Sequence, residues 1–306
     1  MRLVRVKAPE GQAAEVARLA HEAGVPSVTV SQMRSLNEDG SAETKDVIDV
    51  DTATPKAKRF VESLMGAPFF DAEKYSIAIR QPRSVVSKER VRALTWPIVA
   101  PTADIFEELW QFSQVTLSFV GRVLIGAALL AYGMMEQNLL LMVAGLLFLP
   151  LLPTLLAISL GVLSREWRLV GQGLFAFVVA TALIVAGGAI VAAVVGPPLR
   201  FQQFSGMATA AVISTLVGVA TALADADDVG RREMIGLAAT AQVALIPAWF
   251  GISLVIGFSQ AVDPTPPQQR LLTFGVIVAA IVVAATATYA LLGLRGRGLD
   301  KFTARA

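Results

Sequence analysis

The organisation of this chain follows from one stretch, Leu146-Leu-Phe-Leu-Pro-Leu-Leu-Pro-Thr-Leu-Leu-Ala-Ile-Ser-Leu-Gly161. It lies inside a hydrophobic run from about Leu139 to Leu163, which is long enough to cross a bilayer. Pro150 and Pro153 each remove an intrahelical hydrogen bond near the middle of that run. A membrane helix tolerates such a break where neighbouring protein or a wet cavity satisfies the freed carbonyl groups. The stretch therefore predicts a broken membrane helix with polar surroundings.

A second stretch repeats the pattern. Pro153-Thr-Leu-Leu-Ala-Ile-Ser-Leu160 aligns with Pro247-Ala-Trp-Phe-Gly-Ile-Ser-Leu254, with proline, isoleucine, serine and leucine at the same spacing. Paired broken helices in corresponding halves of a chain are typical of secondary transporters. The alternative is a chance match between two apolar helices that each contain proline.

The composition of the whole chain indicates a membrane protein. Of its 306 residues 55% are hydrophobic and only 16% are charged, and the mean hydropathy is +0.62. The net charge of +2 is too small to indicate a nucleic-acid partner. With no cysteine and one histidine, the chain lacks the residues of disulfides, thiolate metal sites and the usual catalytic triads. We therefore expect no enzyme activity, no cofactor and no metal site.

Residues 1–82 have the pattern of a small α/β domain. Apolar and charged residues alternate from Leu3 to Ala8, as in a half-buried strand. The expected strands are 3–8, 25–36, 45–51 and 74–80, and the expected helices are 9–23 and 54–66. The order β-α-β-β-α-β is the ferredoxin-like arrangement. Because the amino terminus lacks the apolar run of a signal peptide, we expect this domain to stay in the cytoplasm, where it serves assembly or binds an effector.

Residues 83–115 are predicted to be a linker that ends in an amphipathic helix. The segment Thr95–Pro101 contains two prolines, and Ile105 and Leu109 then recur at helical spacing with charged residues on the other face. A stripe of this kind, with Trp110 at its edge, suits a helix that lies on the membrane surface. The alternative is a helix that packs against the soluble domain.

Six membrane spans are predicted within residues 116–294, so the fold class is α+β with an all-α membrane domain. The expected spans are 116–135, 139–163, 168–195, 206–224, 235–258 and 271–293. An amino terminus inside the cell places most loop arginines and the basic tail, residues 295–306, in the cytoplasm, as the positive-inside rule requires. The second and fifth spans then run in opposite directions, so the two halves are candidates for a 3+3 inverted repeat. These features predict a multi-pass protein of the cell membrane with both termini cytoplasmic.

The candidate site residues lie in or beside the proline-containing spans. Uncharged polar side chains next to proline either line a polar path or hydrogen-bond a neighbouring helix. The candidate substrate or ion path consists of Pro150, Pro153, Thr154, Ser159, Thr240, Gln242, Pro247 and Ser253. Arg122, the only strongly basic residue within a span, either attracts anions to a vestibule or extends to the lipid headgroups.

Small residues recur at four-residue spacing in the fourth predicted span. They are Ala210, Ser214, Gly218 and Ala222. Such a seam permits close helix packing, either within one bundle or between the protomers of a homo-oligomer.

The segment Asp225-Ala-Asp-Asp-Val-Gly230 resembles the start of a calcium-binding loop. Its fifth position is Val229, and the twelfth, Gly236, has no carboxylate to offer a metal ion. We therefore expect a solvated turn with a helix-capping aspartate.

The chain also resembles a known family. The segment Leu156-Ala-Ile-Ser-Leu-Gly-Val-Leu-Ser-Arg-Glu-Trp-Arg-Leu169 follows the broken span, and Leu245-Ile-Pro247 lies in a second proline-bearing segment. After a ferredoxin-like domain, these features resemble the prokaryotic membrane family called domain of unknown function 389. Where that family typically has Gly-Asp-Trp, this chain has Glu166 before Trp167, and Ser164 in place of the glycine. The resemblance implies an integral membrane protein and no particular biochemical activity.

Two functional hypotheses follow. Paired proline breaks and little charge within the spans favour a channel or secondary transporter for a small ion or solute, regulated or assembled by its cytoplasmic domain. The near absence of acidic residues in the spans argues against a proton pump driven by carboxylates. The alternative is a membrane-anchored sensor or scaffold whose soluble domain binds a small effector or a partner. In both cases the lipid bilayer and further copies of the chain are the expected partners.

Overall fold

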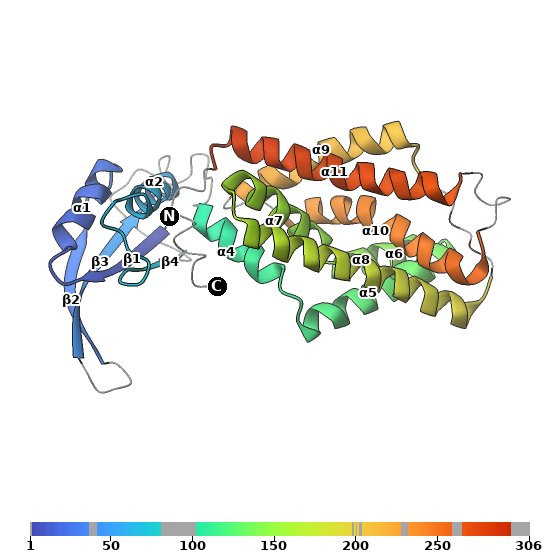
Figure 1. Ribbon diagram of the computed structural model, residues 1–306, viewed down its shortest axis with the longest axis horizontal. Helices are drawn as coiled ribbons and strands as arrows, with labels where there is room; N and C mark the ends of the chain where they lie inside the picture. Colours follow the sequence, from blue (N-terminus) through green and yellow to red (C-terminus); the bar gives the residue numbers. More distant parts are fainter. Residues whose placement is uncertain are drawn as a thin grey trace. The chain divides into compact units, whose positions relative to one another are not determined.

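The computed structural model divides the chain into two compact units (Figure 1). It describes residues 2–36, 42–80, 102–197, 199, 201, 204–227, 232–258 and 265–294. The first unit contains the amino-terminal part up to Ile105, and the second contains Phe106–Asp225 and Gly230–Gly293. The predicted linker before Pro101 and the basic tail after Leu294 lie outside the described residues.

The first unit is a four-stranded antiparallel sheet with two helices. Its elements are β1 (Arg2–Pro9), α1 (Ala13–Glu22), β2 (Thr29–Leu36), β3 (Ala42–Thr52), α2 (Thr54–Met65) and β4 (Ser76–Arg80). The strands lie in the order β2-β3-β1-β4, with Val6 of β1 opposite both Ile48 of β3 and Ile77 of β4. Strands and helices follow one another in the predicted order, although β2 begins at Thr29 rather than at Val25.

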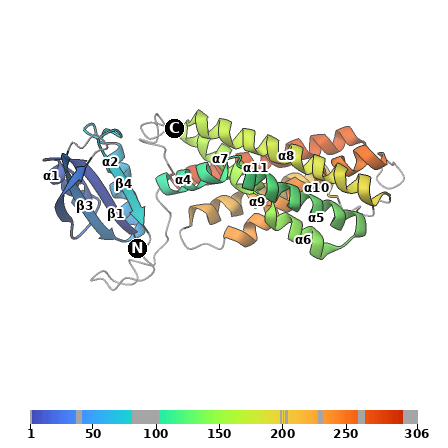
Figure 2. The same ribbon diagram turned by 90° about the horizontal axis from the view of Figure 1, so that it is seen from below.

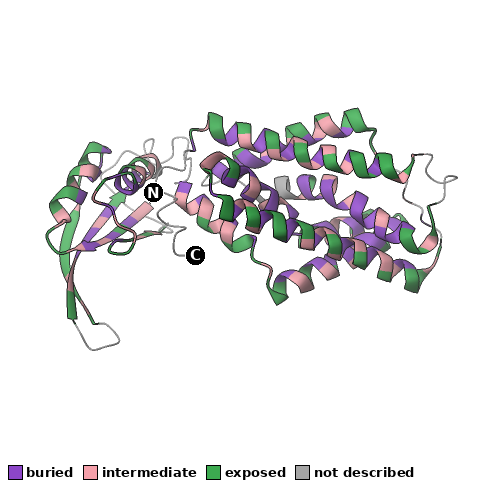
Figure 3. Cartoon of the chain, in the orientation of Figure 1, coloured by how far each residue is buried: buried purple, intermediate pink, exposed green. Residues whose placement is uncertain are grey.

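One face of this sheet carries the core of the first unit (Figure 3). Val4 and Val6 of β1 are fully buried, as are Phe60 and Leu64 of α2. Because successive side chains of a strand point to opposite faces, Arg5 lies on the other side of the sheet. There its guanidinium donates two hydrogen bonds to the Asp49 carboxylate, at 2.7 and 2.8 Å. The alternation seen in the sequence therefore separates an apolar face from a charged one.

A buried carboxylate from strand β3 caps helix α1. Asp46 is only 3% exposed, and its Oδ2 accepts hydrogen bonds from the backbone N–H groups of Gly11 (2.9 Å) and Ala13 (3.1 Å). Its Oδ1 accepts a longer hydrogen bond from Gln32 Nε2 at 3.4 Å. The first amides of a helix have no intrahelical acceptor, and a negative charge at that end interacts favourably with the helix dipole. Asp46 therefore ties the start of α1 to the sheet.

We expect Asp46→Ala to destabilise the first unit by about 2 kcal/mol, because it removes a cap and leaves the partly buried amides of Gly11 and Ala13 without this acceptor. In hydrogen–deuterium exchange of the full-length protein, the α1 amides should exchange roughly 30-fold faster, the factor that this free energy corresponds to. The matched control is Asp51→Ala, an exposed aspartate of the same strand. Equal exchange of α1 in the two variants would show that the cap contributes nothing.

Helix α4 (Thr102–Phe112) begins in the first unit. The Thr102 hydroxyl donates a hydrogen bond to Glu62 Oε1 at 3.1 Å, and Arg2 pairs with Asp104 at 3.0 Å. Burial raises the pKa of Glu62. After its first turn the helix belongs to the second unit. A helix is thus present near the expected residues 103–115, and its first turn contacts Glu62 of α2 and Arg2 of β1.

The described part of the second unit consists of helices and short connections. The helices are α5 (Leu117–Glu136), α6 (Leu139–Phe148), α7 (Leu151–Ser164), α8 (Trp167–Val195), α9 (Met207–Ala226), α10 (Arg232–Ile256) and α11 (Pro267–Leu291). Among the described residues, five helices are long and apolar enough to cross a membrane, and the α6–α7 pair is a sixth candidate span bent by 44°. The long helices run alongside one another in two perpendicular views (Figures 1 and 2). The chain is therefore a multi-pass membrane protein.

The two proline-containing spans differ. Leu149 and Pro150 separate α6 from α7, whereas Pro247 lies inside α10, which continues through it from Arg232 to Ile256. Pro150 and Pro153 withhold two N–H groups from consecutive turns, while Pro247 withholds one. The expectation of a second broken helix is therefore wrong for α10.

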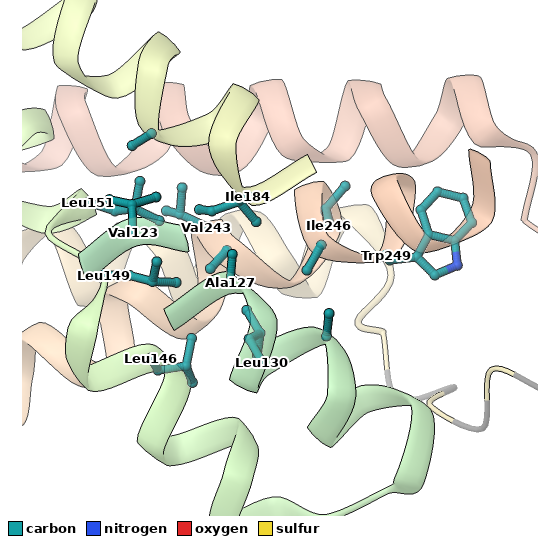
Figure 4. Packing of buried hydrophobic residues seen from close by; sticks show 14 of the residues in the cluster. Val123, Ala127, Leu130, Leu146, Leu149, Leu151, Ile184, Val243, Ile246 and Trp249 are labelled. Atoms are coloured by element: carbon teal, nitrogen blue, oxygen red, sulfur yellow. The ribbon is translucent and has the colours of Figure 1, made fainter. Parts of the chain in front are cut away.

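Glycines allow the helices of the second unit to cross closely. A Cβ atom added at Gly126 of α5 would lie 2.8 Å from the carbonyl oxygen of Gly145 on α6. At Gly251 of α10, a Cβ would overlap the carbonyl group of Val185 on α8. Buried apolar side chains fill the space beside these crossings. Figure 4 shows part of this cluster, including Val123, Leu149, Leu151, Ile184 and Val243.

The predicted small-residue seam lies on one buried face of α9. All four residues, Ala210, Ser214, Gly218 and Ala222, are buried. A Cβ at Gly218 would come within 2.7 Å of the Ile281 carbonyl oxygen on α11, so at this position the seam packs within the same chain. Val212 and Leu216, on another face of α9, are more than half exposed and suit contact with lipid.

Candidate functional site

A cavity of about 440 Å³ lies in the second unit where α6 ends and α7 begins. Helices α4, α5, α9 and α10 complete its walls. Most of the lining is apolar, from Leu109 of α4 to Leu237 of α10. The polar lining residues are Glu108, Arg122, Thr221, Asp225 and Thr240. This volume and this mixture are typical of sites that hold small organic molecules.

The break between α6 and α7 lies at the cavity, and the ends of helices carry backbone groups without intrahelical partners. The first N–H groups of α7, at Leu151 and Leu152, have no acceptor one turn earlier, and no side chain caps this helix end. Pro153 has no N–H to offer. On the α6 side, the N–H of Leu149 donates to the Leu146 carbonyl at 3.3 Å. The amino end of α7 therefore carries partial positive charge, and the carboxyl end of α6 carries partial negative charge.

Asp225 does not lie on the solvated turn that the sequence indicated. It belongs to the last turn of α9, is 7% exposed and lines the cavity. The hydroxyl of Tyr289, a fully buried residue of α11, donates a hydrogen bond of 2.6 Å to its Oδ2. This contact holds the carboxylate at the cavity wall. Asp225 thus lies within the described helix, one position beyond the predicted span 206–224.

The remaining polar groups come from three other elements. Thr240 of α10 is 3% exposed and lines the cavity. Thr221, one turn before Asp225, donates a hydrogen bond to the Gly218 carbonyl at 3.1 Å. Arg122, in the second turn of α5, remains largely exposed, so its long side chain can turn toward the cavity or toward solvent.

The structure brings four of the predicted site residues together. Pro150, Pro153 and Thr240, which were candidates for the substrate path, line the same cavity as Arg122, the vestibule candidate. Glu108 and Asp225 are the charged lining residues that sequence reasoning missed. The sequence did contain a signal for Asp225, because this residue directly follows a long apolar run. Tyr289, which can donate a hydrogen bond, lies near the end of another predicted span.

The other path candidates are not among the lining residues. They are Thr154, Ser159, Gln242, Pro247 and Ser253. The Thr154 hydroxyl donates to the Leu151 carbonyl at 2.6 Å, within α7. The Ser159 hydroxyl lies 2.9 Å from the Leu155 carbonyl oxygen and 3.2 Å from that of Val282 on α11. These two side chains therefore support helix structure and helix packing.

A second polar feature involves Arg270, which directly precedes the predicted span 271–293. It lies in the first turn of α11 and is only 7% exposed. Its guanidinium carbon lies 3.9 Å from the ring centre of Phe204 and 5.7 Å from that of Trp249 on α10. This cation–π contact links α10 and α11 to the segment that precedes α9. None of the three residues lines the cavity.

Neither a metal site nor a relative identifies the chemistry of the cavity. Across the described residues, no group of three or more His, Cys, Asp or Glu side chains is arranged to hold a metal ion. Comparison of the chain with protein-family models, with curated proteins and with solved structures finds no match. The function has to be argued from the cavity itself.

Proposed function

We propose that this chain is a membrane transport protein that binds a small solute in the cavity at the α6–α7 break. The observation that carries the proposal is a cavity of about 440 Å³ among apolar helices, at the point where a broken helix presents unpaired amide and carbonyl groups. In hydrocarbon such groups are costly unless water, protein or a ligand satisfies them. Interrupted helices serve this purpose at the binding sites of many transporters.

The charge distribution of the loops supports an orientation for this site. With the amino terminus in the cytoplasm, the start of α5, the end of α9 and the start of α10 lie toward the cytoplasmic side. These are the segments that line the cavity, so we propose that it belongs to the cytoplasmic half of the bundle. The β-α-β-β-α-β unit, which we assign to the ferredoxin-like folds, then lies in the cytoplasm and serves regulation or assembly.

Uptake into sealed vesicles tests the proposal. The full-length protein is reconstituted into liposomes, and potassium, sodium, chloride and a panel of labelled small organic solutes are offered in turn. Leu156→Trp fills part of the cavity and should lower the uptake of the transported solute by about tenfold or more, because it removes space from the binding site.

The matched control is Leu272→Trp, at a residue of α11 that is 65% exposed. It should transport at the wild-type rate, since it adds the same side chain on an outer surface. Uptake that Leu156→Trp leaves unchanged, in vesicles shown to contain folded protein, would refute the assignment of the cavity as the transport site.

A further inference from the structure

We propose that the turn between α7 and α8 binds an anionic phospholipid, with the lipid phosphate at the turn and an acyl chain along the outer face of α8. Arg165 and Glu166 separate the two helices, and α8 begins at Trp167. None of these residues lines the cavity, so the proposal does not depend on the proposed transport function. Three features support it: a tight turn, an outward positive charge, and an apolar stripe that continues from the turn.

Backbone contacts fix the turn. Arg165 has a φ of 60°, and its N–H donates to the Val162 carbonyl at 3.3 Å. The N–H of Glu166 donates to the Gly161 carbonyl at 2.9 Å. These two bonds form a Schellman motif, which ends α7. A Cβ atom added at Gly161 would lie 2.7 Å from the side chain of Val170, so α8 starts directly against the end of α7.

The charge that the turn presents outward is positive. Arg165 and Arg168 are both exposed, whereas Glu166 between them is 7% exposed. The Cα atoms of the two arginines, three positions apart, are separated by about 11 Å at most. Both long side chains can therefore reach one phosphate group. Arg168 also interacts within the chain, but a guanidinium has five N–H donors, so an exposed arginine can bind a phosphate in addition.

The start of α8 adds to this charge. The first N–H groups of a helix have no intrahelical acceptor, and the residue at the cap position, Glu166, makes no side-chain cap here. The helix dipole places partial positive charge at the same end. A phosphate group close to this turn is therefore attracted by the helix as well as by the two arginines.

An apolar stripe continues from the turn along α8. Trp167, Leu174, Phe175 and Val178 are each more than half exposed, and their spacing places them on one face of the helix. Gly171 lies on the same face, where an added Cβ would meet nothing within 4 Å, so it leaves a gap between the larger side chains. Tryptophan at the end of a span is typical of the headgroup level of a bilayer. The stripe therefore suits an acyl chain whose headgroup lies at the turn.

An anionic phospholipid fits both parts of this surface. A soluble anion would contact the arginines and leave the apolar stripe unused. A zwitterionic headgroup carries an ammonium charge that offsets its phosphate, so the arginines attract it less. Each basic residue near a membrane surface strengthens the attraction to anionic lipid by a factor of about five. We therefore expect a preference for anionic over zwitterionic lipid of about fivefold or more.

Quenching of tryptophan fluorescence by brominated lipids tests the proposal. In the full-length protein, Trp96, Trp110 and Trp249 are replaced by phenylalanine, so that Trp167 alone emits. The protein is reconstituted into vesicles of equal parts phosphatidylglycerol and phosphatidylcholine, with bromine on the acyl chains of one lipid or of the other. The two kinds of vesicle have the same charge, so stronger quenching by brominated phosphatidylglycerol measures selective contact.

The affinity ratio should be about fivefold or more in favour of phosphatidylglycerol. Equal quenching by the two brominated lipids would show that Trp167 contacts only bulk bilayer, and it would overturn the proposal. An absence of quenching by either lipid would show that protein, such as a second copy of the chain, covers Trp167. That outcome would overturn the proposal as well.

Removing the two charges should abolish the preference. The double variant Arg165→Gln with Arg168→Gln should be quenched equally by the two lipids, since the apolar stripe remains. The matched control is Arg18→Gln with Lys74→Gln, which removes two positive charges from exposed residues of the first unit and should keep the preference. A preference that survives in the first double variant would refute the role of the turn.

A difference measurement replaces the single-tryptophan protein if its three changes prevent folding. The wild-type protein and Trp167→Phe, which keeps the other three tryptophans, are compared in the same vesicles. The quenching that is lost in Trp167→Phe belongs to Trp167. This loss should be larger with brominated phosphatidylglycerol, and equal losses with the two lipids would overturn the proposal.

Discussion

Replacing Gly251 by alanine is expected to destabilise the helical unit by about 3 kcal/mol, at the upper end of what overpacking costs. The added Cβ would overlap the Val185 carbonyl group, and on the other helix a Cβ at Gly188 would lie 2.7 Å from the Ala248 carbonyl oxygen. Backbone therefore faces backbone where α8 crosses α10, with no flexible side chain that can turn aside. The two helices have to separate along their contact to admit one methyl group.

Thermal unfolding in detergent, followed by circular dichroism, measures this effect. A loss of about 3 kcal/mol should lower the midpoint by roughly 6–12 °C in a unit of this size. The matched control is Gly275→Ala on α11, where an added Cβ meets nothing within 4 Å. That variant should be as stable as the wild type or slightly more stable, since alanine is the better helix former. Similar midpoints for the two variants would show that the α8–α10 crossing can open without loss.

The hydrophobic runs of the sequence predict the described helices to within a few residues, because a span must be long and apolar whatever it packs against. The break before Leu151 was also predictable, since two prolines three residues apart cannot both be accommodated in one regular helix. The continuity of α10 through Pro247 was not predictable, because a helix tolerates one missing N–H group when neighbouring helices support it. Those neighbours, which include Val185 and Gly188 of α8, are distant in sequence.

The cavity itself was only partly predictable. Local pattern identified Pro150, Pro153 and Thr240 as candidates, because proline breaks and polar residues in a span are visible in the sequence. The burial of Asp225 depends on Tyr289, which lies 64 positions further along the chain. Likewise, the burial of Arg270 depends on the rings of Phe204 and Trp249. Contacts of this kind arise from the tertiary packing of the helices, and the spacing of residues in the local sequence does not predict them.

Replacing Pro150 and Pro153 together by alanine is expected to lower the rate of solute uptake by about tenfold or more. The variant Pro247→Ala should transport at close to the wild-type rate. In the double variant, new N–H groups at positions 150 and 153 can bond to the carbonyls of Leu146 and Leu149. The helix then continues from α6 into α7, the 44° bend is lost, and the unpaired groups at the cavity disappear. In α10 the helix already continues through Pro247, so alanine there adds one hydrogen bond without moving the backbone.

Initial uptake rates in vesicles, compared at equal amounts of folded protein, measure the difference. Unfolding does not explain a loss in the double variant, because each proline-to-alanine change within a helix favours the helix by up to about 3 kcal/mol. The double variant should therefore be at least as helical and as heat-stable as the wild type while it transports poorly. Normal uptake by that variant would show that the break is a packing feature without a role in transport. Loss of uptake in Pro247→Ala instead would indicate that transport depends on α10 and not on the α6–α7 break. The continuous helix α10 would then require its proline for transport.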